Sequence, residues 1–493
     1  MNLWEKFDAS FKKNASANAF YINGRSYSYN EFSEYIAGSQ QLLLKNIGQA
    51  TGIPVGVICN DSIETFAAIF AIWFSGGCFV PLHPLHPAAA NNEKIRQSGL
   101  KFIFDSEKDQ SVGLLAECIY NKDVKSDIPL TISQSPNIAY VLFTSGSTGE
   151  PKGVPINVKN LSAFVDGFLE IYPDLTSKDR FLQTYDLTSD AAFTGYLIPL
   201  LLGATVFTLP AGGFKYLSIV KILQEQQITW IQFTPSVLNY LSPYFKSIRV
   251  ESLKHSHFGG EALPFDLVSE WAECVPNAEI SNIYGPTETT ITCTIHRTNC
   301  DQLKQKVHNG IVSIGKPLKK VKTLIVGEND QIVADGEKGE LCIGGEQVME
   351  GYLTDKRPFF VQEGSDDRYY RSGDLVVCDQ EGFLMYCGRK DDQLKISGYR
   401  VEPAEIEFAV GQAANGLKSK AFGFKNKSGT ESIVVFIEKY ENEPEKLKEA
   451  LRNLLPSALI PEKIIPIGQF PLNSNGKVDK SVLFEKYSTQ IYE

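Results

Sequence analysis

Residues 143–154 read FTSGSTGEPKGV, and this stretch follows the apolar run IAYVL at positions 138–142. Glycines let a backbone approach an anion closely, hydroxyls and amides donate hydrogen bonds to phosphate oxygens, and Lys152 adds a positive charge. A solvated surface loop would have a similar composition, but the strand pattern before it and the ordered string favour a phosphate-binding loop. Because Gly153 follows Lys152, the stretch differs from the loop of P-loop NTPases. We therefore expect this loop to hold the triphosphate of ATP, in a protein that is not a P-loop NTPase.

The length and charge of the chain narrow its class. A chain of 493 residues is too long for one compact core, so two or three domains are expected. Its 48 basic and 58 acidic residues give a net charge of −10 without a long run of either sign. That is not the pattern of a protein that binds nucleic acid or an anionic membrane, so chemistry on a small molecule is the better expectation.

The sequence carries no sign of export or of a metal-binding cysteine pattern. The start, MNLWEKFDASFKK, lacks the apolar segment of a signal peptide, and no run of about 18 apolar residues occurs. We expect a soluble, cytoplasmic protein without membrane insertion. Nine cysteines without a C-x-x-C pair argue against a disulfide framework and a zinc site. His83 and His86 lie in the proline-rich string PLHPLHP, which favours a structural use.

Strand and helix patterns alternate through the first part of the chain. The runs PVGVI (54–58) and TVFTL (205–209) are typical of strands, whereas residues 63–73 have helical apolar spacing. This alternation predicts an α/β fold of layered subdomains. After about residue 310, short strand patterns such as KTLIV (322–326) and GELCI (339–343) predict a small β-rich subdomain at about 310–388.

A break at GRKDD (388–392) precedes a region with its own helix and strand signals. Leu447, Leu451, Leu454 and Leu455 share one helical face, which predicts a helix over residues 444–455, and SIVVFI (432–437) predicts a buried strand. We therefore expect an N-terminal core at 1–388 and a small α+β domain at 389–493.

Five further strings follow the phosphate loop in order: NIYGPTETT (282–290), GELCIGGEQVMEGYL (339–353), YRSGDL (370–375), GRKDDQLKISGYRVEPAEIE (388–407) and NGKVDK (475–480). Together with FTSGSTGEPKGV they resemble the adenylate-forming superfamily, and within it the amino-acid adenylation domains of nonribosomal peptide synthesis and the stand-alone D-alanyl carrier protein ligases. The resemblance extends over nearly the whole chain. It implies a large N-terminal domain, a small mobile C-terminal domain, and the use of ATP and Mg²⁺.

The resemblance also implies roles for individual residues. Transfer of AMP to a carboxylate builds negative charge on phosphoryl oxygens, which must be neutralised. Lys477 matches the lysine that bridges the substrate carboxylate and the α-phosphate, and Glu288 matches the Mg²⁺ ligand. Tyr284 would stack on adenine, and Asp374 would accept hydrogen bonds from the ribose. The other positions implied at the nucleotide are Thr144, Ser145, Ser147, Thr148, Lys152, Gly260, Glu261, Gly285, Thr287 and Arg389.

Each of these residues also has a structural interpretation. Asp374 could cap a turn, Glu288 could cap a helix, and Lys477 could be a solvated loop lysine. In the family the C-terminal domain rotates between two half-reactions. Asp391 matches the hinge residue, and Lys395 lies on the strand implied for the second half-reaction. The pair Asp391-Asp392 could equally be a solvated turn.

One aspartate points to the class of acid. Counting without gaps from Arg180 brings Asp190 to the position where amino-acid-activating members pair an aspartate with the substrate ammonium. A buried carboxylate without a partner costs roughly several kcal/mol, which favours a cationic ligand group. Ser189 replaces the usual aromatic residue, and Asp186 offers a competing alignment. We expect an α-amino acid as the substrate.

The implied pocket favours a small side chain. Phe258 stands where members with large substrates often have a small residue, so we expect glycine, alanine or serine. Without a second charge, the pocket does not suit acidic or basic substrates. The matched positions are Asp190, Ala191, Thr194, Ser236, Ser256, Phe258, Ile283, Ile291 and Thr292. Ser236, Ser256 and Thr194 could bind a substrate hydroxyl or a backbone carbonyl.

Two other functions compete with this interpretation. An acyl- or aryl-CoA synthetase would share every nucleotide string, but its substrate would offer no ammonium to Asp190. A non-catalytic nucleotide-binding scaffold would not need Lys152, Glu288, Asp374 and Lys477 together. Because the chain ends at Glu493 without a carrier segment, we expect the acceptor phosphopantetheine thiol on a discrete acyl or peptidyl carrier protein.

Overall fold

A computed structural model describes residues 1–133, 138–144, 151–210, 215–354, 359–361, 367–391, 393–396, 398–427, 429–471 and 478–492. The chain forms two compact units. The first consists of Met1–Pro84, Lys94–Phe143 and Gly153–Lys390, and the second of Leu85–Glu93, Thr144–Lys152 and Asp391–Glu493. Within the described residues, no helix combines the length and the apolar character needed to cross a bilayer.

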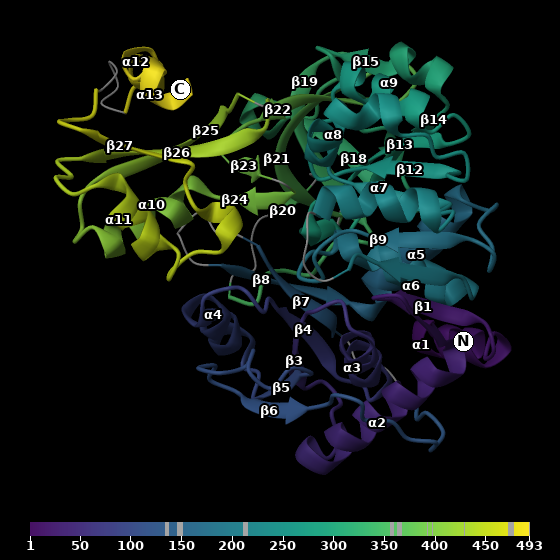
Figure 1. Cartoon of the computed structure of the whole chain (residues 1–493). Helices are drawn as coiled ribbons and strands as arrows, with labels where there is room; N and C mark the ends of the chain where they lie inside the picture. Colours follow the sequence, from purple (N-terminus) through teal and green to yellow (C-terminus); the bar gives the residue numbers. More distant parts are fainter. Residues whose placement is uncertain are drawn as a thin grey trace. The chain divides into compact units, whose positions relative to one another are not determined.

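A nine-stranded, mostly parallel sheet dominates the first unit (Figure 1). In sheet order its strands are β17 (Lys316–Pro317), β14 (Thr294–Thr298), β13 (Glu279–Tyr284), β12 (His255–Phe258), β11 (Trp230–Phe233), β9 (Arg180–Gln183), β10 (Thr205–Thr208), β1 (Asn18–Ile22) and β2 (Arg25–Ser28). The six strands from β13 to β1 are parallel, and antiparallel strands pair at both edges. Parallel strands bring their carboxyl ends to one edge of the sheet, where polar loops can meet.

Helices cover both faces of this sheet. On one face Ile231, Phe233 and Phe258 share a core with α7 (Lys215–Glu225), α8 (Pro235–Leu241) and α9 (Phe265–Cys274). On the other face Phe181 and Trp230 share a core with α1 (Leu3–Lys13), α5 (Val158–Ile171) and α6 (Ala191–Leu202). Alternate residues of each strand therefore face different helices, and neither face is left to solvent, as the apolar runs predict.

A six-stranded sheet carries the predicted phosphate loop between its last two strands. Its order is β6 (Glu117–Tyr120), β5 (Phe102–Asp105), β3 (Pro54–Ile58), β4 (Cys78–Leu82), β7 (Ile138–Thr144) and β8 (Lys152–Asn157). The associated helices are α2 (Tyr29–Ile47), α3 (Ile63–Phe74) and α4 (Ala88–Ser98). The strand expected at 54–58 and the helix expected at 63–73 are confirmed. All residues of α3 are buried, so this helix is a core element on every side.

A third sheet follows in the sequence. It consists of β18 (Val321–Val326), β19 (Lys338–Gly345), β21 (Arg368–Cys378) and β20 (Phe359–Val361), with β22 (Leu384–Arg389) paired to β21. β15 (Val307–His308) and β16 (Ile311–Val312) form a separate pair, and the short 3₁₀ helices are η1 (Ser242–Ser247), η2 (Thr287–Thr289), η3 (Cys300–Lys306) and η4 (Glu328–Asp330). The β-rich part begins at Val321, because β17 pairs with β14 of the large sheet.

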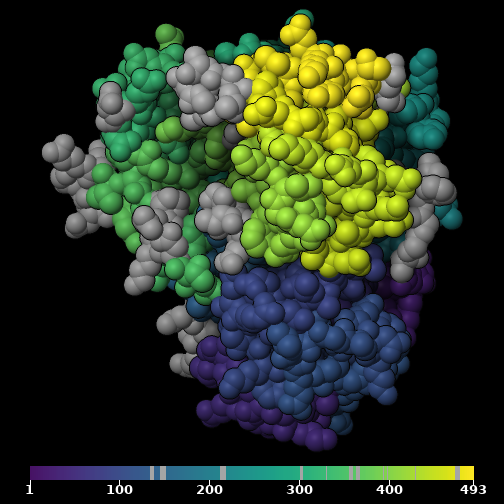
Figure 2. Space-filling model, turned by 90° about the vertical axis from the view of Figure 1, so that its left-hand side faces the viewer, coloured from purple at the N-terminus to yellow at the C-terminus, as the bar shows by residue number. Residues whose placement is uncertain are grey.

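The second unit is an α+β fold of its own. Its elements after Asp391 are β23 (Leu394–Ile396), β24 (Tyr399–Val401), α10 (Pro403–Ala413), β25 (Ser419–Lys425), β26 (Glu431–Glu438), α11 (Pro444–Leu451), η5 (Ser457–Leu459), β27 (Lys463–Ile467), α12 (Lys480–Lys486) and α13 (Ser488–Tyr492). In the space-filling view these residues, yellow-green to yellow, form one continuous surface (Figure 2). The mixed α/β class with a large and a small unit is thus confirmed.

The helix expected at 444–455 is shorter than the leucine spacing predicts. α11 ends at Leu451, and Leu455 reaches the same core from the turn that follows. Pro456 comes directly after Leu455, and the residue before a proline is disfavoured in helical conformation. The prediction was therefore right about the apolar face and wrong about the helix end.

Candidate functional site

The candidate site begins where β13 ends at Tyr284. The chain turns through Gly285, where an added Cβ would lie 2.4 Å from the carbonyl oxygen of Ile291, so only glycine fits. Thr290 (φ 59°) and Ile291 (φ 68°) are both in the left-handed region, at a cost of about 1–3 kcal/mol each. We call these two residues the strained turn. The short segment that contains it carries six of the predicted residues: Tyr284, Gly285, Thr287, Glu288, Ile291 and Thr292.

Three of the residues predicted at the nucleotide meet in one buried cluster. The Tyr284 hydroxyl donates to Asp374 Oδ2 at 2.6 Å, and Arg389 Nη1 donates to Asp374 Oδ1 at 3.0 Å. Asp374 on β21 lies opposite Arg389 on β22 in the strand register, which fixes their approach. Burial, followed by the charge of Asp374, raises the pKa of Tyr284 well above its usual value, so this phenol stays a donor. The cluster combines an aromatic ring, a carboxylate and a guanidinium, the groups expected around a nucleoside.

Glu288, the predicted metal ligand, is fully buried in η2. Its Oε1 accepts a hydrogen bond of 2.7 Å from the Tyr352 hydroxyl, and its backbone carbonyl accepts one of 2.9 Å from the Met349 amide. Among the described residues no cluster of three or more His, Cys, Asp or Glu side chains could hold a metal by itself. A single carboxylate fits Mg²⁺ that takes its other ligands from phosphates and water.

Asp190 precedes α6 and is a buried carboxylate with an unsatisfied oxygen. The residue is 9% exposed, and its Oδ2 has no hydrogen-bond partner among the described residues. Burial raises the pKa of Asp190 to about 7; the Thr287 hydroxyl and the Ile291 and Ala191 amides lower it, whereas the charge of Glu288 raises it. The carboxylate therefore has amide and hydroxyl donors beside it, but no cation is among the groups that shift its pKa.

A second unsatisfied polar atom lies one helical turn away. Thr194 is fully buried, and its Oγ1 also lacks a hydrogen-bond partner within the described part of the chain. Residues four apart share a helix face, so Thr194 and Asp190 face the same way. The other predicted pocket residues Ile283, Ile291 and Thr292 are buried, Ala191 is half-buried, and Phe258 is buried in the core under α9.

Two serines predicted in the pocket are already engaged. The amide and hydroxyl of Ser236 donate to the Glu261 carboxylate at 2.8 and 3.0 Å, which caps the first turn of α8. The Ser256 hydroxyl accepts a hydrogen bond of 3.0 Å from the Trp271 indole. Of the three hydroxyls that could bind a substrate hydroxyl, only that of Thr194 lacks a partner within the described residues.

The remaining predicted residues belong to other parts of the chain. Gly260 adopts φ +83° directly before Glu261. In the second unit, Thr144 ends β7, Lys152 begins β8, Asp391 opens the C-terminal region, and Lys395 lies on β23 opposite Arg400. Ser145, Ser147, Thr148 and Lys477 lie outside the described residues.

The structure adds two residues that the sequence analysis did not assign to the site. His83 Nε2 lies 2.6 Å from Asp186 Oδ2, and Asp186 also accepts from the amide and hydroxyl of Thr188 at 2.8 Å. Asp186, the competing candidate for the ammonium partner, is therefore already paired. Gln347, fully buried, donates from Nε2 to backbone carbonyls of the strained turn. A single sequence shows neither contact, because both join segments far apart in the chain.

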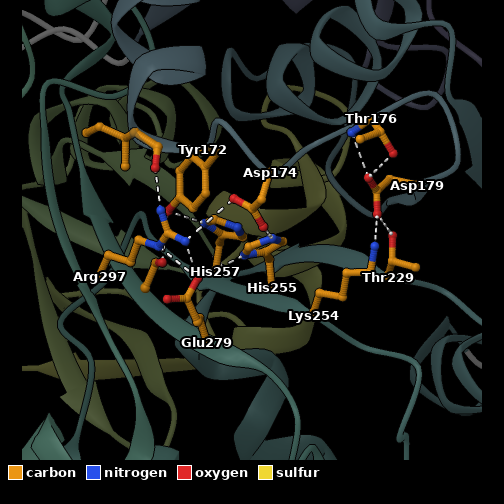
Figure 3. A network of polar contacts seen from close by, with 12 residues as sticks. Tyr172, Asp174, Thr176, Asp179, Thr229, Lys254, His255, His257, Glu279 and Arg297 are labelled. Carbon is orange, nitrogen blue, oxygen red and sulfur yellow. Dashed lines mark hydrogen bonds and ion pairs between the residues drawn. The ribbon is translucent and has the colours of Figure 1, made fainter.

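A separate polar network lies at the amino-terminal edge of the same sheet (Figure 3). Asp179, just before β9, accepts hydrogen bonds from Lys254 (2.8 Å), the Thr229 hydroxyl (2.9 Å) and the Thr176 amide (2.8 Å). His255 Nε2 lies 2.9 Å from Asp174 Oδ2, and Arg297 Nε donates to Glu279 Oε2 at 2.8 Å. Burial would raise the pKa of Asp179, but these donors lower it below its usual value.

The chain is similar in sequence to two known synthases. It is 32% identical over 490 residues to zwittermicin A synthase ZmaJ of Bacillus cereus, covering 93% of this chain and 91% of that protein. It is 30% identical over 500 residues to gramicidin S synthase 2 of Aneurinibacillus migulanus, covering 98% of this chain but 11% of that protein. The chain thus corresponds to nearly all of the first relative and to one segment of the second.

Solved structures share the fold over nearly the whole chain. The Vibrio cholerae adenylation domain AlmE, in complex with glycyl-adenosine-5'-phosphate, has a TM-score of 0.85 at 24% identity and covers 99% of this chain and 98% of its own. IdnL7 has a TM-score of 0.71 at 28% identity and covers 99% of both chains. The family model of AMP-binding enzymes matches residues 7–353. The chain therefore belongs to the AMP-binding enzymes of the adenylate-forming superfamily and is an adenylation domain related to those of nonribosomal peptide synthetases.

Proposed function

We propose that the protein activates a small α-amino acid with ATP and then transfers it to the phosphopantetheine thiol of a separate carrier protein. In the first step a carboxylate oxygen of the amino acid attacks the α-phosphorus of ATP. The bond from that phosphorus to the bridging oxygen breaks, and pyrophosphate leaves. In the second step the carrier sulfur, having lost its proton, attacks the acyl carbon, and AMP leaves.

The unsatisfied carboxylate of Asp190 carries the assignment to amino acids. A buried Asp with a pKa of about 7 and a free Oδ2 among the described residues needs a cation to become stable as the anion. The α-ammonium of an amino acid supplies a charge and three donors of the right size. A fatty or aromatic acid supplies neither, so it would leave Asp190 unsatisfied.

The first step needs groups that neutralise phosphate charge and hold the nucleotide. Mg²⁺ would supply positive charge to the phosphate oxygens, and buried Glu288 would hold it. Asp374 would accept hydrogen bonds from the ribose, with Arg389 and Tyr284 fixing its orientation. Lys152 and Lys477 would neutralise phosphate oxygens, and Thr144, Ser145, Ser147 and Thr148 would donate hydrogen bonds to them.

We propose a small amino acid, as the residues matched in the sequence favour. The buried Ile283 and Ile291 support a narrow pocket, whereas Phe258 is buried in a separate core under α9. The structure of AlmE with its bound glycyl-adenylate supports glycine among the candidates. The Thr194 hydroxyl, which has no partner within the described residues, lies one turn from Asp190 and would suit a serine side chain, so glycine, alanine and serine remain the proposed substrates.

The second step would use a rotation of the C-terminal unit. The two units divide between Lys390 and Asp391, where we propose the hinge, and Lys395 on β23 would face the active site after the rotation. A Lys477→Ala variant should lose most adenylation yet still transfer supplied aminoacyl-adenylate to the carrier. Equal loss of both activities would contradict the rotation.

Pyrophosphate exchange tests the function directly. The purified protein, with ATP and Mg²⁺, is assayed with small amino acids, fatty acids and aryl acids. Exchange with glycine, alanine or serine, and none with the other acids, is the expected result. Exchange only with fatty or aryl acids would replace the proposal by an acyl- or aryl-CoA synthetase, and no exchange with any acid would overturn it.

A further inference from the structure

The strained turn at Thr290–Ile291 is held by one buried side chain. Gln347 Nε2 lies 2.8 Å from the carbonyl oxygen of Thr292 and 3.2 Å from that of Thr290. In return, the Thr290 hydroxyl donates to the carbonyl of Gln347 at 2.5 Å. A carboxamide that bonds two carbonyls of one turn opposes the relaxation of its left-handed residues toward ordinary backbone angles.

The segment around Gln347 is itself fixed from two sides. Asn160, at the start of α5, donates from Nδ2 to the carbonyls of Glu346 (2.7 Å) and Val348 (3.0 Å). The Met349 amide donates to the carbonyl of Glu288 at 2.9 Å. Gln347 therefore extends from a loop that Asn160 also anchors to the start of α5.

The turn determines how the chain passes Asp190. The Ile291 amide is among the groups that lower the pKa of Asp190, and the carbonyl of Ile291 closes over Gly285, where no Cβ would fit. If the turn relaxed, this amide would move away from Asp190, and the buried Ile291 side chain would move with it. The carboxylate would then lose one of the groups that favour its charged form.

We propose that Gln347 is a positioning residue for amino-acid binding, which holds the Thr290–Ile291 turn so that Ile291 and Asp190 form the ammonium site. The inference rests on the proposed function for its substrate, although the contacts themselves do not. Gln347 acts through the turn and makes no contact with reacting atoms, so it should affect the binding of the amino acid more than that of ATP.

The test uses Gln347→Met, which keeps the length of the side chain and removes its donors. We expect the KM for the amino acid in pyrophosphate exchange to rise about tenfold or more, with the KM for ATP within about twofold of wild type. Thr290→Val removes only the hydroxyl bond to Gln347 and should shift the amino-acid KM the same way by less. It provides the test if Gln347→Met does not fold.

Asn121→Leu is the matched control, because Asn121 is also a buried amide that donates to a backbone carbonyl, that of Glu64, at 3.1 Å. It should lower the melting temperature and leave both KM values unchanged. Hydrogen–deuterium exchange of the peptide around 285–295 gives a readout independent of the substrate, and it should accelerate in Gln347→Met but not in Asn121→Leu.

If Gln347→Met left the hydrogen–deuterium exchange of peptide 285–295 unchanged, the positioning role would be overturned, whichever acid the protein activates. If hydrogen–deuterium exchange became faster in Gln347→Met but the KM for the amino acid did not change, the link to amino-acid binding would be overturned. Equal rises in the KM values for the amino acid and for ATP would overturn it as well. The proposed function itself is tested with the wild-type protein. It fails if pyrophosphate exchange occurs only with acids that lack an amine, or with no acid at all.

Discussion

Asp179 and Asp190 are two buried aspartates at opposite ends of strand β9 in the large sheet. Their surroundings differ in the groups that stabilise the charged carboxylate. Asp179 receives hydrogen bonds from Lys254, Thr229 and Thr176, and its pKa is lowered although burial opposes this. Within the described residues, the groups that lower the pKa of Asp190 are amides and a hydroxyl, and burial raises it to about 7. The comparison supports the proposal for Asp190: no cation is among the groups that shift its pKa within the described residues, and a ligand ammonium would supply one, as Lys254 does for Asp179.

Removing the charge at Asp190 should have the largest effect on activity. In Asp190→Asn we expect kcat/KM for the amino acid to fall by roughly a hundredfold or more, because the ammonium loses its charged partner in a buried site. The folded-state pKa of Asp190 lies above its unfolded value, so its ionisation destabilises the protein as the pH rises toward and past 7. Chemical denaturation at pH 8 should therefore show Asp190→Asn to be more stable than wild type, and a lower stability would contradict this difference between the two aspartates.

The same substitution at Asp179 should have the opposite pattern. Asp179→Asn leaves Lys254 and two other donors without their charged acceptor, so we expect about 1–3 kcal/mol of lost stability at pH 7. The lowered pKa of Asp179 stabilises the protein above the unfolded value, near pH 4, and this contribution is lost as the pH falls through the folded value. Denaturation at pH 7 and pH 3 measures it. Pyrophosphate exchange per folded molecule should stay at the wild-type level, and a large loss would mean that the two ends of the strand are coupled.

The network of Asp179 also predicts an effect of acid. His257 is fully buried near Tyr172, His255 and Arg297 (Figure 3). Burial lowers the pKa of His257 well below 6.5, and the charges of His255 and Arg297 lower it further. Because the unfolded chain binds this proton below about pH 6.5 and the folded chain does not, stability should fall with decreasing pH, by at most about 1.4 kcal/mol per unit for this group. His257→Phe should reduce that slope, as measured by denaturation between pH 7 and pH 5. An unchanged slope in His257→Phe would contradict this assignment.

The smallest effect is expected at Thr194, whose neutral hydroxyl has no partner in the part of the chain that the structure describes. Thr194→Val keeps the shape and removes the orphan oxygen, so stability should change by less than about 1 kcal/mol. If serine is the substrate, its kcat/KM should fall up to about tenfold while that of glycine stays constant. Equal changes for both amino acids would assign the Thr194 hydroxyl to packing alone.

The sequence predicts the framework of this protein well, because local patterns determine it. The run PVGVI forms β3, and the apolar stretch 63–73 forms a helix that ends one residue later. The helix predicted at 444–455 ends at Leu451. The spacing of the leucines shows which residues face the core, but it does not show where the helix ends before Pro456. Packing of Leu455 from a turn satisfied the same core without a continuous helix.

The candidate site could be predicted only in part. Motif strings identify Tyr284, Asp374 and Arg389, which the structure brings within hydrogen-bonding distance. They do not reveal that His83 pairs with Asp186 or that Gln347 holds a turn 55 to 57 residues earlier in the chain. Such contacts depend on how distant segments pack, and no periodicity within one segment encodes them.

The most direct test of the ammonium site compares matched acids on two proteins. Wild type and Asp190→Asn are assayed by pyrophosphate exchange with glycine, alanine and serine, and with acetate, propionate and 3-hydroxypropionate, which differ from them only by the α-amine. The account predicts that wild type prefers the amino acids by about a hundredfold or more and that most of this preference disappears in Asp190→Asn. The same preference in both proteins would contradict it.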